Sequence, residues 1–561
     1  MRTIRIAVLP LLMASAAALA QSIPPAVKSA EAGVDPEKIR AHVRFLSDDL
    51  LEGRGPGTRG GEVAAEYIAT QFALYGLKPG GDNGTYLQQV SFVGTKALAD
   101  KTHFSLVPDK PKGGGMSIML HSYDLNYGDD YTVNNRRLTT SVEINAPIVF
   151  VGYGVVAPEY GWDDYAGVDV KDKVVLCIVG DPPSDDPKFF GGKALTYYGR
   201  WTYKFEEAAR HGAIGALIIH RTDLASYGWD VVKNSNTSEK TYLRDNKDPQ
   251  LAAASWIQLE VARTLFKAAN LDLEIEMTAA GKKGFKATQL PVSLEAHIES
   301  DVRSFQSPNV VGVLPGANVA AGKPDQAVMY TAHYDHLGFV PGMTGDNIYN
   351  GAADNATGCG MLLEMARDWT TLKMPPPHSV IFASVAAEEQ GLLGSEYLGQ
   401  HPPVPPAQIA LDINYDMILP VGIPREVNLN GAQRTTFNAV VQATAKRFDL
   451  AIVPDARPEA GSYYRSDHFS LSRVGIPAFS VDQGELFEGH DKAWGEEKSK
   501  AFVDHDYHNF SDNYHSDWDF KGNAKLVRFG MELGWEAISA PKTIQWLKGD
   551  EFEAARKASA K

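Results

Sequence analysis

The feature that most constrains the fold of this 561-residue chain is the alternation of short apolar segments with helical segments after residue 307. Each apolar segment is bounded by turn-forming residues, which is the pattern of a buried strand. Strands that alternate with helices favour an α/β fold, with a mixed, mostly parallel sheet and helices on both faces. The predicted strands are 309–314, 327–332, 379–385, 409–415 and 478–481, and the clearest helices are 357–369, 435–448 and 524–539.

The length of the chain predicts more than one domain. Between residues 140 and 290 short strands alternate with Gly and Pro turns, which indicates an inserted β-rich module. The remaining segments, 35–135 and 300–540, are then the two parts of one discontinuous domain. Residues 548–561 are rich in Ala, Lys and Glu, and we expect a frayed tail there.

The first twenty residues have the pattern of a signal peptide. Arg2 and Arg5 precede a short apolar run, and Ala18-Leu19-Ala20 is a small-residue cleavage site. We therefore expect export to the periplasm or the cell exterior. The run is shorter than the ~20 residues that a spanning helix needs, and no later stretch is apolar enough, so we expect no membrane span.

Charge and cysteine content restrict the possible partners. The formal net charge is −15 and no Lys/Arg cluster is visible, which argues against a nucleic-acid partner. The chain has two cysteines, Cys177 and Cys359, each in a separate apolar segment. An exported protein could join them, but two free buried thiols fit the pattern better. Oligomeric state is not predicted.

Histidine and carboxylate residues follow the predicted strands. In an open α/β sheet the carboxyl ends of the strands form the binding edge, so these side chains should meet. Two histidines with three or more carboxylates and no cysteine suit Zn²⁺ or a similar ion. Five ligands exceed the needs of one tetrahedral ion with an open position, and they suit two ions that share a carboxylate. The set is His333, Asp354, Glu388, Glu389, Asp416 and His508.

The order of these residues resembles family twenty-eight of the metallopeptidases, which comprises co-catalytic di-zinc aminopeptidases and relatives such as glutamate carboxypeptidases. The resemblance covers about 35–135 and 300–540, and the insert at about 140–290 resembles a protease-associated domain. The motifs that carry it are His333-Tyr334-Asp335, Gly351-Ala352-Ala353-Asp354-Asn355-Ala356-Thr357-Gly358, Glu388-Glu389-Gln390-Gly391-Leu392-Leu393-Gly394-Ser395, Asn414-Tyr415-Asp416-Met417 and Tyr507-His508.

The resemblance implies a ligand set for two zinc ions, although other divalent metals are possible. Asp354 would bridge the two ions. His333 and Asp416 would complete the ligands of one ion, and Glu389 and His508 those of the other.

The resemblance also implies roles for three residues that do not bind metal. Glu388 would act as general base on a metal-bridging hydroxide and then protonate the leaving amine. Asp335 would orient His333, as metal-bound imidazoles usually require. Tyr507 would hydrogen-bond the developing oxyanion.

Several neighbouring residues are set aside. His508 is preferred to His505 and His515 because Tyr507 and Asp512 frame it as in the family. The near neighbours left out of the ligand set are His336, which follows His333 by three residues, and Ser466-Asp467-His468, which resembles a substrate-side segment and equally a loop with a capping Asp.

The glycine-rich stretch 53–61 lacks the Gly-Lys-Ser/Thr ending of a phosphate loop. We interpret it as a surface turn with two exposed arginines, Arg54 and Arg59.

These observations predict an exported di-zinc aminopeptidase that acts on peptides with a free N-terminus. A carboxypeptidase or dipeptidase of the same family is the alternative, because the ligand set does not separate them. A glutaminyl cyclase would use one ion. An inactive peptidase-like binding protein would be expected to lack ligands, and all of them are present here.

Overall fold

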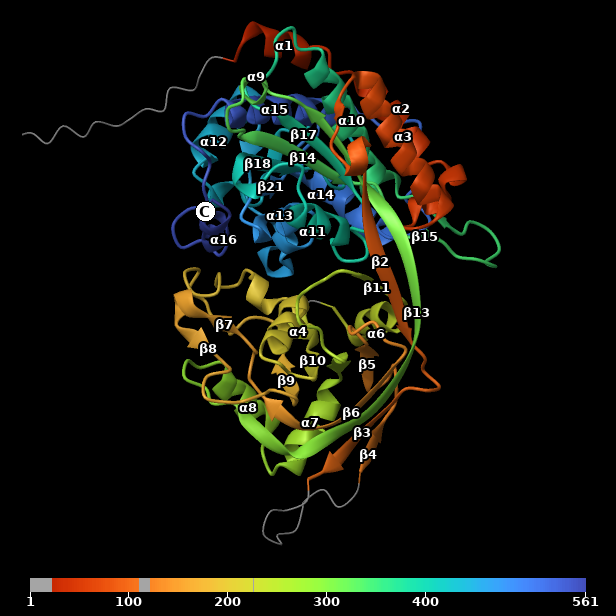
Figure 1. Ribbon diagram of the computed structural model, residues 1–561, viewed down its shortest axis with the longest axis vertical. Coiled ribbons are helices and arrows are strands. Elements are labelled where there is room, and N and C mark those ends of the chain that lie inside the picture. Colours follow the sequence, from red (N-terminus) through yellow and green to blue (C-terminus); the bar gives the residue numbers. More distant parts are fainter. Residues whose placement is uncertain (1–22, 110–121, 226, 561) are drawn as a thin grey trace, which may run out of the picture.

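A single 27-residue strand, β13 (Thr288–Leu314), runs through both lobes of the molecule. The computed structural model describes residues 23–109, 122–225 and 227–560, so the predicted signal peptide, residues 1–20, lies outside the described residues. Figure 1 shows an upper lobe that holds both ends of the described chain and a lower lobe built from its middle third. The upper part of β13 belongs to one sheet and the lower part to another.

The upper sheet has the strand order β21-β18-β14-β17-β13. The first four strands are parallel and β13 is antiparallel to β17, which confirms the predicted mixed, mostly parallel sheet. These strands match the predicted segments to within two residues. They are β14 (Ala327–His333), β17 (Val380–Val385), β18 (Ile409–Asn414) and β21 (Ala478–Ser480).

Helices cover both faces of this sheet, as expected. On β14, Val328 and Tyr330 pack into one apolar cluster and Met329 into another, because successive side chains point to opposite faces. The face that Val328 joins is covered by α1 (Pro25–Glu31), α2 (Pro36–Leu46), α3 (Arg59–Tyr75), α10 (Thr357–Thr370), α12 (Asn438–Arg447) and α15 (Lys521–Ile538). The other face is covered by α11 (Leu393–Gln400) and α13 (His468–Arg473).

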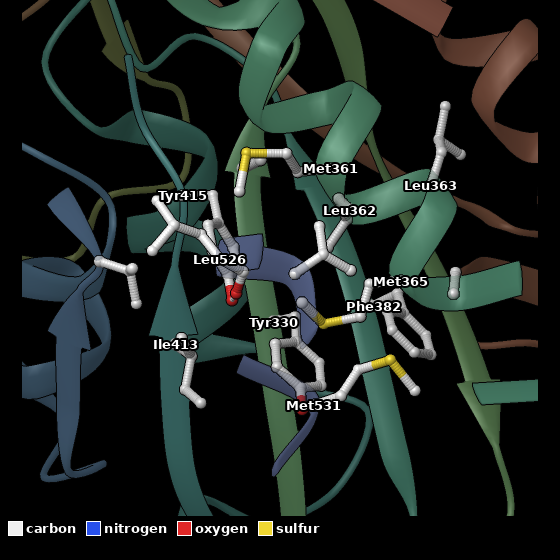
Figure 2. Packing of buried hydrophobic residues seen from close by; sticks show 14 of the residues in the cluster. Tyr330, Met361, Leu362, Leu363, Met365, Phe382, Ile413, Tyr415, Leu526 and Met531 are labelled. Atoms are coloured by element: carbon white, nitrogen blue, oxygen red, sulfur yellow. Dashed lines mark hydrogen bonds between the residues drawn. The ribbon is translucent and has the colours of Figure 1, made fainter. Parts of the chain in front are cut away.

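Figure 2 shows the larger of these two clusters, in which Tyr330 lies between α10 and α15. The ring of Tyr330 stacks on Phe382 of β17 with centroids 5.6 Å apart. Its hydroxyl donates to the carbonyl of Gly530 in α15 at 2.9 Å. The dense packing on both faces fixes the carboxyl ends of β14, β17 and β18 relative to one another.

The lower lobe has its own sheet and apolar core. Part of β13 pairs there with β3 and β6, and β6, β9, β10 and β12 are parallel neighbours followed by antiparallel β5. The strands are β3 (His103–Pro108), β4 (Tyr123–Leu125), β5 (Tyr131–Asn134), β6 (Ser141–Phe150), β9 (Val174–Ile178), β10 (Gly215–Ile219) and β12 (Ala253–Ile257). The helices are α4 (Trp201–Arg210), α6 (Trp229–Thr237), α7 (Leu259–Ala268) and α8 (Leu273–Ala280).

The predicted start of this lobe, residue 140, lies too far along the chain. Phe104, Leu106 and Tyr131 belong to its apolar core, although we placed residues 35–135 in the other domain. The reason is that β3 pairs with the continuation of β13, a contact between distant parts of the chain. The resemblance of the lobe to a protease-associated domain stays a prediction.

Both cysteines are buried and free. Within residues 23–109, 122–225 and 227–560, no helix has the length and apolar character that crossing a bilayer requires.

The prediction of a frayed tail at 548–561 was wrong for most of its length. Glu553–Ser559 forms α16, and Phe552 and Arg556 are buried. Phe552 packs against Tyr463, Phe469 and Trp546 in a separate aromatic cluster. An Ala, Lys and Glu composition therefore does not exclude an ordered segment when one aromatic residue anchors it.

Replacing Phe552 with Ala should lower the free energy of unfolding by about 3 kcal/mol, because the aromatic cluster loses its central ring. Thermal unfolding followed by circular dichroism measures the change. Lys548→Ala, at an exposed position in the same tail, is the control and should have an effect of about 0.5 kcal/mol or less. Equal effects of the two substitutions would contradict a packed tail.

Candidate metal centre

Two groups of buried histidine and carboxylate side chains meet at the carboxyl edge of the upper sheet. One is His333, Asp354 and Asp416, and the other is His336, Asp354 and Glu389. Asp354 belongs to both groups. The predicted strand-end residues therefore come together in space, although they are up to about 80 positions apart along the chain.

The first group is built on the ends of β14 and β18. His333 is the last residue of β14, and its Nε2 lies 3.2 Å from Asp416 Oδ1 and 3.3 Å from Asp354 Oδ1. Ser466 Oγ donates to Asp416 Oδ2 at 2.6 Å and holds this carboxylate in place. Ser466 belongs to the segment that we left open between a substrate-side role and a plain loop, and its hydroxyl contacts a candidate ligand.

The second group is built around Glu389, which follows β17. Its Oε2 lies 3.0 Å from His508 Nε2 and its Oε1 lies 2.6 Å from His336 Nδ1. His508 Nε2 is also 3.3 Å from Asp354 Oδ2. The two oxygens of Asp354 thus face one group each, which is the arrangement that a bridging carboxylate requires.

His336, which we set aside as a near neighbour, lies in the second group. Its side chain is fully buried, and its Nε2 has no hydrogen-bond partner among the described residues. A buried ring nitrogen without a partner is costly, and a cation would satisfy it. The second group therefore has two candidate nitrogen ligands, His336 and His508. The only sequence signal was the spacing of three residues from His333.

The three histidines near the C-terminus differ in what they contact. His508 reaches Asp354 and Glu389, whereas His505 is exposed and His515 packs beside Trp518 with ring centroids 5.5 Å apart. Only the first of the three contacts the candidate ligands.

Asp335 supports the site in a way that differs from the prediction. The atom nearest to His333 Nδ1 is the backbone oxygen of Asp335 at 3.2 Å, and the carboxylate is farther away at 3.8 Å. The carboxylate instead accepts hydrogen bonds from the backbone N–H groups of Glu388, at 3.0 Å, and Glu389, at 3.4 Å. Asp335 thereby couples the end of β14 to the two glutamates.

Asp512 holds the loop that carries Asp354. Its carboxylate accepts hydrogen bonds from the backbone N–H groups of Ala353, at 2.8 Å, and Asp354, at 3.0 Å. The loop begins at Gly351, which has φ +57°, and a Cβ there would lie 2.5 Å from the His336 ring. Glycine is therefore required at this position.

Arg54 is a further supporting residue, and its predicted exposure was wrong. Its side chain is 1% exposed, and its guanidinium donates to the carbonyls of Tyr334 at 2.7 Å and Gly351 at 2.8 Å. It also donates to the carbonyls of Leu46 and Asn350. One side chain thus joins the loop after His333 to the loop before Asp354. Five fixed N–H groups make arginine suited to this role, but no local pattern in 53–61 indicated it.

The charge of the site favours bound cations. Although burial alone would raise the pKa of Asp354, hydrogen bonds with His333 and His508 hold it well below its usual range. Burial likewise opposes ionisation of Glu389, yet His336 and His508 lower its pKa to about 2. Burial would lower the pKa of His508, but Glu389 and Asp354 raise it to about 10. Protons on the histidines thus balance the acids, and metal ions can take the place of such protons. The carboxylate and imidazole donor set fits zinc.

Glu388 is the acid that no neighbour neutralises. Burial, together with the carboxylates of Glu389 and Asp416, raises its pKa well above the usual range, and His333 opposes this only in part. Among the described residues, no hydrogen bond to its side chain is formed. An acid that favours its protonated form beside a metal centre is suited to proton transfer.

Tyr507 lies against the second group. Its ring stacks on His508 with centroids 3.9 Å apart. Burial and the charges of Asp354 and Glu389 raise the pKa of its phenol well above the usual range, so the hydroxyl keeps its proton and can donate a hydrogen bond.

Parts of this chain are similar to known proteins. Residues 309–528 match the family model described as Peptidase family M28. Leupeptin-inactivating enzyme 1 of Streptomyces exfoliatus is 27% identical over 247 residues, which are 42% of this chain and 51% of that protein. An aminopeptidase of Pseudomonas aeruginosa (strain UCBPP-PA14) is 28% identical over 291 residues, which are 48% of each chain. A solved aminopeptidase structure from Aneurinibacillus sp. strain AM-1 has a TM-score of 0.49 and 18% identity, over 91% of this chain and 96% of that chain.

The matched segment contains both candidate metal groups and the upper sheet that positions them. This segment of the chain is similar to peptidase family M28. The chain spans about half the length of the Streptomyces and Pseudomonas relatives.

Replacing Arg54 with Met should weaken zinc binding about 10- to 100-fold, the usual effect of removing a group that orients metal ligands. Zinc retained against a competing chelator measures the affinity, with circular dichroism as a check on folding. Arg59→Met is the matched control, because this exposed arginine has no side-chain partner among the described residues, and its affinity should stay within twofold. If both variants hold zinc equally well, Arg54 does not support the site.

Proposed function

We propose that the chain is a zinc aminopeptidase that hydrolyses the N-terminal residue from peptides. The donor set, the match of residues 309–528 to the model of peptidase family M28 and the names of the relatives support this function. Two ions would be held, one by His333, Asp354 and Asp416, and one by Asp354, Glu389 and His508 with His336 beside them. The observation that carries the proposal is the pairing of this donor set with a half-buried Glu388 whose side chain has no hydrogen-bond partner among the described residues.

Bound zinc ions would supply Lewis-acid polarisation of the scissile carbonyl and would make an attacking water more acidic. Glu388 accepts the proton of that water as the new C–O bond forms. It then donates the proton to the amine as the C–N bond breaks.

Tyr507 and the acids of the site position the substrate. The phenol of Tyr507 is the hydrogen-bond donor available to the oxyanion of the tetrahedral intermediate. The free α-amino group of the substrate is a cation, and the acid-rich metal centre attracts it. Water enters and two products leave, an amino acid and a shortened peptide.

Two further parts of the proposal concern the rest of the chain. We propose that residues 1–20 direct export, on the basis of Arg2, Arg5 and the apolar run before Ala18-Leu19-Ala20. The lower lobe, which contains most of 140–290, is proposed to be a protease-associated domain.

Substituting Glu388 with Gln should reduce kcat about 10²- to 10⁴-fold, because the amide cannot accept the proton of the water. Hydrolysis of an amino-acid nitroanilide measures kcat, and atomic absorption measures zinc. Zinc content should equal that of the unmodified protein. Glu260→Gln, at an exposed position on the lower lobe, is the control and should be fully active. Loss of zinc from the Glu388 variant would contradict the assignment of Glu388 as the general base.

Removing zinc with a chelator should abolish hydrolysis, and adding zinc should restore it. Activity that survives complete chelation would contradict a metal-dependent mechanism. A zinc-loaded protein that hydrolyses no peptide or nitroanilide would instead favour an inactive peptidase-like binding protein.

A further inference from the structure

A short strand from the lower-lobe part of the sequence packs against the loop that carries Glu388. This strand, β11 (Lys240–Leu243), lies in the chain between α6 and β12, which belong to the lower lobe. It nevertheless pairs antiparallel with β2 (Leu87–Ala97), and β2 pairs with β13 in the upper sheet (Figure 1). The insert therefore adds an edge strand to the sheet that carries the candidate metal centre.

Contacts at both ends of β11 fix its register on β2. The backbone N–H of Arg244 donates to the carbonyl of Ser91 at 3.0 Å. Before the strand, the carboxylate of Glu239 accepts two hydrogen bonds from Arg303 of β13, at 2.7 and 2.8 Å. Glu239 crosses β2 at Gly94, where a Cβ would lie 2.6 Å from its carboxyl carbon. A slip of one residue would turn the buried face of β11 outward, so these contacts also decide which side chains face the loop.

One face of β11 meets the loop that follows β17. Burial alternates along the strand, so Thr241 and Leu243, which are 6% and 5% exposed, point to the same side. The hydroxyl of Thr241 donates to Oε1 of Gln390, the residue after Glu389, at 3.4 Å. Leu243 belongs to a buried apolar cluster whose other members are Val90, Phe92, Ala387 and Leu393.

Ala387 and Leu393 are the two ends of a closed loop. The N–H of Leu393 donates to the carbonyl of Ala387 at 3.1 Å. Within the loop, the N–H groups of Gly391 and Leu392 both donate to the carbonyl of Glu388 at 2.8 Å. Ala387 has φ +55°, a conformation that a non-glycine residue keeps only where its surroundings enforce it. The apolar cluster that includes Leu243 supplies such surroundings at both ends of the loop.

The two glutamates of this loop are held in different ways. Asp335 accepts hydrogen bonds from the backbone N–H groups of both. The carboxylate of Glu389 is also held by His336 and His508. The side chain of Glu388 has no hydrogen-bond partner among the described residues. The place of its carboxylate is therefore set by the backbone of the loop, with Asp335 on one side and β11 on the other.

We propose that Leu243 and Thr241 of β11 are positioning residues for Glu388, through which the insert takes part in catalysis. The inference rests on the proposed role of Glu388 as general base, and it assigns the insert a function at that site. A loop that loses its packing on β11 moves the carboxylate of Glu388 relative to the attacking water. Displacements of about 1 Å can cost about 10²-fold in rate, even when the groups that bind metal and substrate stay in place.

The first test is Leu243→Ala in the full, zinc-loaded chain, with hydrolysis of an amino-acid nitroanilide as the assay. We expect kcat to fall about tenfold and KM to stay within twofold, because the substituted residue is placed to act on the base and not on substrate binding. Leu243→Val leaves a smaller cavity and should give an intermediate kcat. Zinc content should not change, because two histidines hold the Glu389 carboxylate. Loss of zinc, or a kcat equal to that of the unmodified protein, would overturn the inference.

Leu106→Ala is the matched control for the effect of a cavity as such. Leu106 is a fully buried leucine on β3, in the apolar core of the lower lobe. Its removal should lower the midpoint of thermal unfolding without changing kcat at 25 °C. Equal losses of kcat in the Leu106 and Leu243 variants would show that general destabilisation is the cause, which contradicts a positioning role.

A double-mutant cycle shows whether Leu243 acts through Glu388. In a chain that already carries Glu388→Gln, Leu243→Ala should change the remaining kcat less than twofold, because no base is left to position. A further loss of about tenfold in this background would mean that the two residues act independently, and the inference would be wrong.

Hydrogen exchange on the metal-free chain tests the same packing without an assay of activity. The amides of 388–393 should exchange about tenfold faster in Leu243→Ala, and at the unmodified rate in Leu106→Ala. Exchange that Leu243→Ala leaves unchanged would contradict the positioning role even if the enzyme is active. If the unmodified, zinc-loaded protein hydrolyses no substrate, the proposed function itself fails.

Discussion

The structure depends on the concentration of negative charge at one edge of the upper sheet. Asp335, Asp354, Glu388, Glu389 and Asp416 converge there in buried or nearly buried positions, and only three imidazoles face them. Such a cluster is unfavourable by itself, because desolvated carboxylates repel one another. The surrounding packing must hold it together, and a cation would satisfy the unpartnered ring nitrogen of His336.

The support for this cluster comes from backbone and side-chain contacts that span long stretches of the chain. Arg54 joins the loops after His333 and before Asp354, and Asp335 and Asp512 each hold two consecutive backbone N–H groups. Ala387, Met417 and His508, which lie beside or within the site, have positive φ angles. Non-glycine residues hold this strained backbone only where the surroundings enforce it. The site is therefore a rigid arrangement imposed by the fold rather than a flexible surface group.

The lower lobe packs against the upper lobe near α13. It grows from the same strand, β13, that forms part of the upper sheet, so its position is coupled to the site by continuous hydrogen bonding. Packing of Tyr197 on Phe469 closes the boundary between the lobes near α13.

Much of the fold and of the candidate ligand set could be predicted from the sequence, because apolar periodicity and strand-end residues are local patterns. The upper strands, the helices α10 and α15, and the positions of His333, Asp354, Glu389 and Asp416 all follow from such patterns. Three features could not be predicted in the same way. His336 and Arg54 look like ordinary loop residues until distant segments surround them, and β3 joins the lower lobe only because β13 continues into it.

The sequence by itself determined the chemistry that this chain carries, since residue types and their order are written there. Only the tertiary structure decided which of these groups share one buried space, because charge repulsion, hydrogen bonding and burial act between atoms that the chain separates by hundreds of residues.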